Sequence, residues 1–276
     1  MRLKKVIFLH MPKTAGTTLH SLIERNYPCK QIYSARRPAI SVADRILRLD
    51  ERRLNELSIV KGHFPYGVHE VLPGYWEYFT FLRNPLKRVV SDYNFVLTQP
   101  GSGDYQLING GKVPIDKAVK GNYLLDNLQT RFLLGGRYLD RSNRVEITKA
   151  DGDLALTRLK RFWFIGLQEK FDAGVGILAT KLGWSRLMYI RRNPSSAKMS
   201  VIPVNLKDAI NEREVYDWAL YRYAREFFSS IERESQVFRS RPDDVGCTSS
   251  KYTAMQTYYR YLLCRLIWLI KGDRSL

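Results

Sequence analysis

Cysteine is scarce in this chain of 276 residues, which contains only Cys29, Cys247 and Cys264. The three do not form a Cys-x-x-Cys pair, and an odd number of cysteines does not predict a disulfide framework. The spacing also lacks the paired ligands of a zinc site. We therefore expect unpaired thiols, a reducing compartment and no bound metal.

Long apolar runs are also missing. The most hydrophobic stretch, residues 261–270, is too short to span a bilayer and contains Arg265. Residues 258–271 are aromatic, basic and apolar, so they could make peripheral contact with a membrane or dock on a partner, although packing on their own domain is slightly favoured. The predicted first strand begins at Val6, and we expect no signal peptide or N-terminal anchor. Together these features predict a cytoplasmic protein, with the inner face of the membrane as a further location.

Acidic residues are few relative to basic ones, with 27 Asp and Glu against 45 Lys and Arg and a formal net charge of +18. This excess predicts a polyanionic partner: nucleic acid, anionic lipid or an acidic polymer. No nucleic-acid recognition motif accompanies the charge, so an acidic saccharide or a membrane surface fits better. The length and the 45% hydrophobic content predict one substantial core. We assign it to residues 1–240, followed by a C-terminal tail over residues 241–276.

The most informative stretch is the predicted first strand, residues 6–9, and the turn after it. Helical spacing of apolar residues begins near Thr17, so a short loop joins a strand to a helix. Such a turn directs backbone N–H groups and the positive end of the helix dipole at one point, which makes an anion site. The loop offers a charged lysine, hydroxyl donors and a glycine that permits close approach, in the run Lys13, Thr14, Ala15, Gly16, Thr17 and Thr18.

The order of residues in this loop differs from that of ATPases. Their G-x-x-x-x-G-K-[ST] motif places Lys directly before the Ser or Thr that holds magnesium. Here Lys13 precedes Thr17 by four residues. A P-loop kinase is therefore the weaker interpretation, and taken alone the segment is equally consistent with a plain strand–turn–helix.

A second anion-binding motif follows another predicted strand, residues 78–83. Asn84 can cap the next helix and Pro85 suits its first position, and the helix is expected to end near residues 97–98. Arg83 lies at the carboxyl end of the strand, where open α/β sheets bind ligands, and Ser91 lies nearly two turns into the helix. Two such motifs favour a ligand with two separated anionic groups.

A histidine is predicted at the same edge of the sheet. Residues 57–63 indicate a strand that ends in Gly62 and His63. An imidazole with a pKa near 6.5 can remove a proton at neutral pH, so His63 is our candidate general base, and a structural histidine is the alternative. We expect His10 to order the phosphate loop. Two roles are equally consistent with the position of His69: a loop residue without a specific function, or a residue that contacts the acceptor.

The two motifs resemble those of PAPS-dependent carbohydrate sulfotransferases, in the branch related to heparan sulfate 2-O-sulfotransferases. Residues 10–19, HMPKTAGTTL, resemble the 5′-phosphosulfate loop, and residues 81–93, FLRNPLKRVVSDY, resemble the 3′-phosphate motif. PAPS, 3′-phosphoadenosine 5′-phosphosulfate, carries anionic groups on both sides of its ribose. The resemblance spans most of residues 1–235 and implies a soluble member of bacterial type.

The resemblance implies roles for individual residues. Lys13 and the loop residues through Thr18 would hold the 5′-phosphosulfate, Arg83 and Ser91 would hold the 3′-phosphate, and no metal would be needed. His63 matches the family's catalytic histidine, whereas Lys61 stands where some members have a second histidine, which leaves its role open. A basic loop over the nucleotide would use Arg191, Arg192 or Lys198. An Asn-x-Gln-x-Arg pattern would lie near the acceptor or, equally, on a polar helix surface: Asn127, Gln129 and Arg131.

The predicted fold is a three-layer α/β domain of P-loop type, with a mainly parallel central sheet flanked by helices. We also expect a flexible loop over residues 99–114, a helix over residues 122–134 and a long helical region over residues 206–238. The predicted function is sulfuryl transfer from PAPS to a hydroxyl of a carbohydrate: an acidic polysaccharide, an oligosaccharide or a glycolipid. The alternatives are a kinase, a nucleic-acid- or polyanion-binding protein, and a PAPS-binding protein without catalysis. The acceptor sugar and the oligomeric state stay open.

Overall fold

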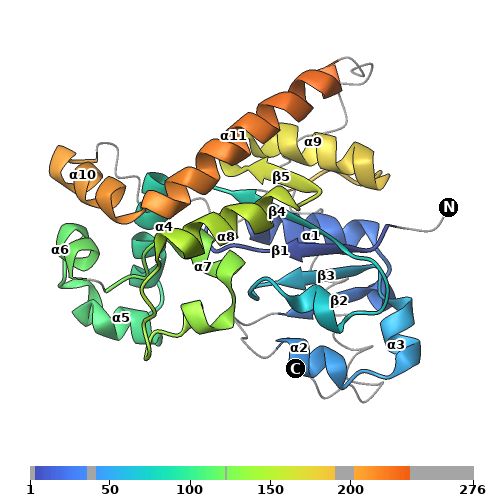
Figure 1. The fold of residues 1–276 in the computed structure, drawn as a ribbon, viewed down its shortest axis with the longest axis horizontal. Coiled ribbons are helices and arrows are strands. Elements are labelled where there is room, and N and C mark those ends of the chain that lie inside the picture. The colour runs from blue at the N-terminus through green and yellow to red at the C-terminus, as the bar shows by residue number, and fades with distance from the viewer. Residues whose placement is uncertain (1–3, 36–41, 122, 190–201, 237–276) are drawn as a thin grey trace.

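A five-stranded parallel sheet forms the centre of the protein, in a computed structural model that describes residues 4–35, 42–121, 123–189 and 202–236 (Figure 1). The strand order is β2-β3-β1-β4-β5, and each neighbouring pair is parallel. Almost every strand residue is buried, as expected for parallel strands covered on both faces. The strands are β1 (Val6–Leu9), β2 (Ile32–Ala35), β3 (Ile59–Gly62), β4 (Glu77–Leu82) and β5 (Phe164–Leu167).

Helices connect the strands and extend the chain after β5. They are α1 (Gly16–Asn26), α2 (Val42–Leu47), α3 (Glu51–Glu56), α4 (Pro85–Leu97), α5 (Gly103–Leu107), α6 (Ile115–Lys120), α7 (Leu128–Leu134), α8 (Lys149–Lys160), α9 (Phe171–Leu182), α10 (Val204–Arg213) and α11 (Val215–Gln236). Short 3₁₀ turns are η1 (Cys29–Gln31), η2 (Val68–Val71), η3 (Asn109–Gly111), η4 (Gly136–Leu139) and η5 (Gln168–Lys170). The predicted start of α4 is confirmed, since the Asn84 side chain accepts from the Lys87 N–H and Pro85 is the first helical residue.

Ring contacts place the helices on the two faces of the sheet. On one face Phe8 contacts His20 on α1, and Phe81 contacts Phe171 at the start of α9. On the other face Tyr78 stacks on Phe162, which follows α8. The sheet is therefore a middle layer between two helical layers, and the predicted three-layer α/β fold is confirmed.

A smaller apolar cluster lies at the C-terminal part of α4. It joins α4 to α5, α6 and α10, and its fully buried members include Ile108 and Ile210. The prediction of a flexible loop over residues 99–114 is therefore wrong, because this segment contains α5 and η3. Ser102 caps α5 by accepting from the Tyr105 N–H, and Ile108 anchors the segment in the cluster.

Two further helix predictions need correction. The helix predicted from residue 122 begins only at Leu128, because Asn127 has a left-handed backbone with φ 46°. The long helical region from residue 206 is broken at Glu214, between α10 and α11. Glu214 is fully buried and faces Arg88, so an internal ion pair accompanies the break.

Some expectations lie outside the described residues, namely the basic loop of Arg191, Arg192 and Lys198 and the tail over residues 241–276. Cys29 is disulfide-bonded, so the expectation of an unpaired thiol is wrong for this residue. Among the helices that the structure describes, none has the length and apolarity to cross a membrane. The cytoplasmic location stays a prediction.

Candidate anion-binding and catalytic site

The predicted site residues gather at the carboxyl ends of β1, β3 and β4. In the sheet, β1 lies between β3 and β4. The chain leaves β1 toward β2 on one side, whereas it leaves β4 toward β5 on the other, so the connections diverge between β1 and β4. Ligands of open α/β sheets bind at such a switch point.

The loop after β1 has an unusual backbone. Lys13 and Ala15 have left-handed φ values of 68° and 65°, although neither is glycine. The Thr14 hydroxyl donates to the Met11 carbonyl over 2.8 Å, which closes the loop on itself. Ala15 is the N-cap of α1 and provides no side-chain cap, and the first turn contains no acidic residue. The first N–H groups of α1 thus lack a side-chain cap and an acidic neighbour, which suits an anion.

The loop side chains differ in how they are placed. Thr17 is exposed, Thr18 is buried, and the buried Thr14 hydroxyl is used inside the loop. Lys13 reaches α4, where its ammonium lies 3.9 Å from the ring centre of Phe95. Burial lowers the pKa of Lys13, and nearby Asp92 opposes the shift.

Arg83 connects the second motif to the first. Its guanidinium donates to the Lys13 carbonyl over 3.0 Å, and its Nε is buried without a hydrogen-bond partner among the described residues. Burial lowers the pKa of Arg83, although Glu169 opposes this effect. Ser91 is half-buried on α4, one turn before Phe95 and therefore on the same face as the ring that Lys13 contacts. An orphaned arginine nitrogen beside an uncapped helix start fits a ligand with anionic groups at both motifs.

The backbone of Arg83 is held by the interior of the protein. The Gln129 carboxamide accepts from the Arg83 N–H over 2.9 Å and donates to the Arg83 carbonyl over 3.1 Å. Asp217 in turn accepts from the Gln129 side chain and from the backbone and hydroxyl of Thr130. Thus α11 fixes α7, and α7 fixes Arg83.

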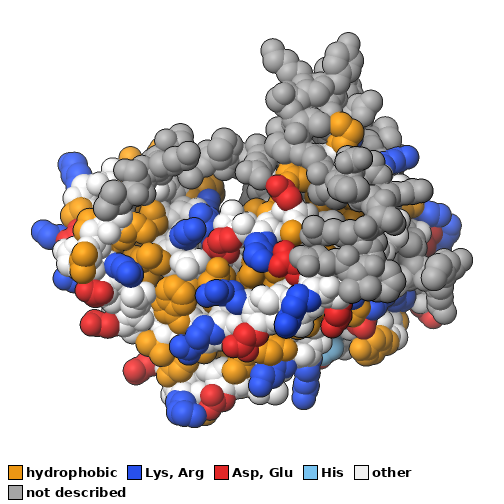
Figure 2. All heavy atoms as spheres, turned by 90° about the horizontal axis from the view of Figure 1, so that it is seen from above, with side chains coloured by type: hydrophobic (Ala, Val, Ile, Leu, Met, Phe, Trp, Pro, Cys, Tyr) orange, Lys and Arg blue, Asp and Glu red, His pale blue; other side chains and the backbone are white. Residues whose placement is uncertain are grey.

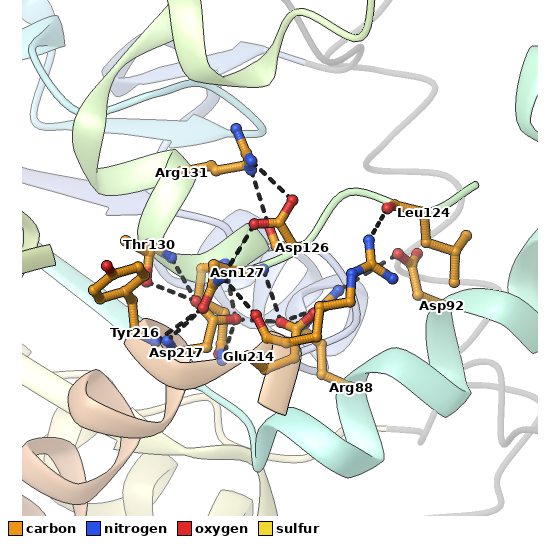
Figure 3. A network of polar contacts seen from close by, with 12 residues as sticks. Arg88, Asp92, Leu124, Asp126, Asn127, Thr130, Arg131, Glu214, Tyr216 and Asp217 are labelled. Atoms are coloured by element: carbon orange, nitrogen blue, oxygen red, sulfur yellow. Dashed lines mark hydrogen bonds and ion pairs between the residues drawn. The ribbon is translucent and has the colours of Figure 1, made fainter. Parts of the chain in front are cut away.

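This corrects the interpretation of the Asn-x-Gln-x-Arg pattern. Asn127, Gln129 and Arg131 are at most 3% exposed, so the alternative of a polar helix surface is wrong, and the position near the acceptor stays a prediction. Asn127 bonds the start of α11, and Arg131 pairs with Asp126 (Figure 3). Their buried positions were missed because a polar residue at every second position of a helix does not by itself indicate burial.

A second buried cluster of charged side chains joins α4 to the start of α11. Arg88, 1% exposed, lies 3.2 Å from the Glu214 carboxylate and 3.7 Å from that of Asp217 (Figure 3). The Asp92 carboxylate also lies 3.4 Å from Arg88, so three carboxylates share this arginine and their mutual repulsion disfavours ionisation of all three. Burial raises the pKa of Glu214 to about 7; Arg88 opposes this shift, and the nearby Asp217 carboxylate adds to it.

His63 follows β3 at the same edge. Its Nδ1 lies 2.8 Å from the His10 carbonyl oxygen, an acceptor, so Nδ1 carries the proton and donates. In the neutral ring Nε2 is then the unprotonated nitrogen, as a general base requires. Burial lowers the pKa of His63, so this form persists at neutral pH.

His10 and His69 have internal roles. A Cβ on Gly16 would lie 1.8 Å from His10 Nε2, so the ring occupies the space that only glycine leaves at the start of α1. The prediction that His10 orders the loop is thus supported by this contact. His69 is half-buried, with Nδ1 3.0 Å from the Tyr78 hydroxyl, which favours a structural role over an acceptor contact.

Lys61, His20 and Glu24 form a polar group with His10. Of these four residues, only His10 and Lys61 were identified as candidates from the sequence. Lys61, which was singled out, is 1% exposed and pairs with Glu24 at 2.6 Å. His20 lies between Lys61 and His10, at 3.1 and 3.0 Å. The sequence signal for the group was a lysine in an apolar strand, together with a His and a Glu four residues apart on one helix face. In the described ranges, no cluster of three His, Cys, Asp or Glu side chains could hold a metal ion.

Comparison with known protein families gives a match over part of the chain. No curated protein matches the chain. Residues 2–125 match the model of the Sulfotransferase family, and this segment contains the phosphate loop, His63, Arg83 and Ser91. In this segment the chain is therefore similar to the Sulfotransferase family, which supports sulfuryl transfer as the class of its reaction.

Proposed function

We propose that this protein is a PAPS-dependent carbohydrate sulfotransferase, of the branch related to heparan sulfate 2-O-sulfotransferases. The observation that carries the proposal is the hydrogen bond from Arg83 to the Lys13 carbonyl. It brings two anion-binding motifs to one edge of the sheet, and PAPS has two anionic groups separated by a ribose. The fold and the family match are consistent with this reading.

The residues divide between the two ends of the donor. The N–H groups at the start of α1, Lys13 and the hydroxyls of Thr17 and Thr18 would bind the 5′-phosphosulfate. Arg83 and Ser91 would bind the 3′-phosphate, because a guanidinium suits phosphate geometry. When bound, PAPS supplies the sulfuryl group and leaves as adenosine 3′,5′-bisphosphate.

His63 and Lys13 would act on the reacting atoms. His63 Nε2 accepts the proton of the acceptor hydroxyl as its oxygen attacks sulfur in line. The Lys13 ammonium stabilises the negative charge that grows on the departing phosphate oxygen. Removal of this positioned cation is expected to slow transfer more than it weakens binding of the donor.

The acceptor is proposed from chemistry and charge. The net charge of +18 suits an anionic saccharide. On the described part of the face in Figure 2, Lys and Arg side chains are spread among acidic and apolar ones over a wide area.

Calorimetric titration with adenosine 3′,5′-bisphosphate tests the proposal, with Mg–ATP titrated in parallel. We expect micromolar or tighter binding of the bisphosphate and its loss in Arg83→Ala. Arg52→Ala is the matched control, because the Arg52 side chain is 91% exposed. Preference for Mg–ATP, or equal binding by Arg83→Ala and Arg52→Ala, would overturn the proposal in favour of a kinase or a nonspecific polyanion-binding protein.

A further inference from the structure

A chain of polar side chains runs from the inner side of α1 to the catalytic edge. Glu24 pairs with Lys61 at 2.6 Å, Lys61 lies 3.1 Å from His20 Nδ1, and His20 Nε2 lies 3.0 Å from His10 Nδ1. The His10 ring stacks on His63 with 3.9 Å between ring centres. Three segments of the chain contribute: His10 directly follows β1, α1 provides Glu24 and His20, and β3 provides Lys61.

The Lys61 ammonium determines which atoms donate and which accept along this row of hydrogen bonds. An ammonium only donates, so His20 Nδ1 must accept from Lys61. His20 then carries its proton on Nε2 and donates to His10 Nδ1. His10 in turn carries its proton on Nε2. A proton added to either of these two rings would place a donor against a donor, next to a buried cation.

The third imidazole is oriented differently. His63 Nδ1 donates to the His10 carbonyl and so its Nε2 is free of a proton. The His63 ring stacks on the ring of His10, and the position of the His10 ring depends on its hydrogen bond from His20. Of these three rings, only His63 can take up a proton without reversing a hydrogen bond to another side chain.

We infer that Lys61 is a positioning residue for His63 and acts through His20 and His10, which it holds as neutral Nε2–H tautomers. This inference rests on the proposed function for the role of His63, whereas the tautomers follow from the contacts alone. Of the three imidazoles of His10, His20 and His63, Lys61 thereby leaves only that of His63 able to take up a proton. Gly16 supports the arrangement by leaving space for the His10 ring.

The charges around the group agree with this assignment. Among the described residues, Lys61 and Lys13 are cations near the histidines, and Glu24 is a carboxylate that pairs with Lys61. Burial, followed by the nearby Lys61, lowers the pKa of His20 well below its usual range. Burial also lowers the pKa of His10 well below that range, with His63 and then Lys61 as further causes.

The chain has only four histidines, so their side chains can be followed individually by nitrogen-15 NMR of the full-length protein labelled at histidine. Long-range proton–nitrogen spectra distinguish the two tautomers and the protonated ring. We expect His10 and His20 to remain Nε2–H tautomers across the pH range in which His63, an Nδ1–H tautomer when neutral, takes up its proton. A His10 or His20 ring that carries its proton on Nδ1, or that titrates before His63, would overturn the inference.

Substitution of Lys61 provides the second test. Lys61→Met removes the charge and the donor, so we expect mixed tautomers of His10 and His20 and a raised pKa for at least one of them. Lys61→Arg, which keeps both, should restore the native pattern in part. Lys30→Met is the control, because Lys30 is exposed. If Lys61→Met and Lys30→Met give the same histidine spectra, the inference is wrong.

The kinetic readout separates positioning from mere stability. The assay is sulfate transfer to a saccharide that the wild-type protein sulfates. Lys61→Met should lower kcat at least tenfold and shift the acidic limb of the pH–rate profile. The KM for the donor should change less than threefold. An unfolded Lys61→Met would leave the wild-type tautomers as the deciding measurement. Failure of bisphosphate binding would contradict the proposed function but not the tautomers, so the two failures are distinguishable.

Discussion

The guanidinium of Arg83 donates to the carbonyl oxygen of Lys13, 70 residues away in the sequence. A residue expected to bind one end of the donor thus holds the backbone of a residue expected to bind the other end. The left-handed φ of Lys13 is maintained in part by this bond. Changes that move Arg83 should therefore also disturb the phosphate loop.

Gln129 is predicted to be necessary for donor binding without touching the donor. Gln129→Met removes both hydrogen bonds to the Arg83 backbone and one to Asp217. Buried polar groups that lose their partners cost about 1–3 kcal/mol each. Bisphosphate affinity measured by calorimetry should fall at least tenfold, together with a lower Tm. Gln106→Met, at an exposed position of α5, should change neither quantity, and unchanged affinity in Gln129→Met would contradict the prediction.

Gly16 and His10 should behave as a coupled pair. Gly16→Ala places a Cβ inside the His10 ring and is expected to destabilise the protein by about 1–3 kcal/mol, as overpacking does. In the background of His10→Ala the same change should be neutral or stabilising, because alanine favours a helix by about 1 kcal/mol over glycine. Urea unfolding of the two single variants and the double variant measures the coupling. Additive costs would show that the two residues do not interact.

His63→Ala should abolish chemistry and leave donor binding intact. Loss of a general base lowers kcat by about 10²–10⁴-fold. Because burial lowers the pKa of His63, its basic form is present at neutral pH, and the acidic limb of the wild-type profile should lie below pH 6.5. Transfer of radioactive sulfate to saccharides gives the rate, and calorimetry gives the bisphosphate affinity. An unchanged kcat in His63→Ala would show that His63 is not the general base.

Glu214 should make stability depend on pH. Its pKa is raised to about 7 in the folded protein from an ordinary value of 4.5, so the folded state binds a proton that the unfolded state has released. The protonated carboxyl therefore stabilises the fold most below pH 4.5, and this contribution is lost as pH rises through about 7. It amounts to no more than about 3 kcal/mol.

Glu214→Gln tests this directly, because its carboxamide oxygen can still accept from the Asn127 N–H. Urea unfolding at several pH values should show similar stability for both proteins at low pH and a relative gain for Glu214→Gln above pH 7. A difference that stays constant with pH would refute the assignment.

Local patterns predicted much of the fold and the edge of the sheet at which the candidate site residues lie. The apolar run of residues 6–9 and the Asn84-Pro85 cap predicted β1 and the start of α4 correctly, because both signals depend on near neighbours. The carboxyl ends of parallel strands necessarily meet at one edge, so Lys13, His63 and Arg83 could be assigned to the same side of the sheet before the strand order was known.

Features that depend on distant partners were not predictable. The helix predicted from residue 122 begins only after Asn127, whose side chain accepts hydrogen bonds from the start of α11, about ninety residues later. Ile108 is buried in an apolar cluster that includes residues of α10, which lies far along the chain. The role of Lys61 was open for the same reason, since neither His20 nor Glu24 is near it in sequence.

The position of β1 in the sheet determines when the site can form during folding. Its neighbours are residues 59–62 and residues 77–82, so neither is available in a local hairpin or helix. The Thr80 hydroxyl, which donates to the Leu9 carbonyl just before the phosphate loop, arrives only with β4. Contacts of such sequence separation slow folding, because long loops must close first. We therefore expect the candidate anion site to form only when both neighbouring strands have docked, and a nascent chain that ends before residue 77 to lack it.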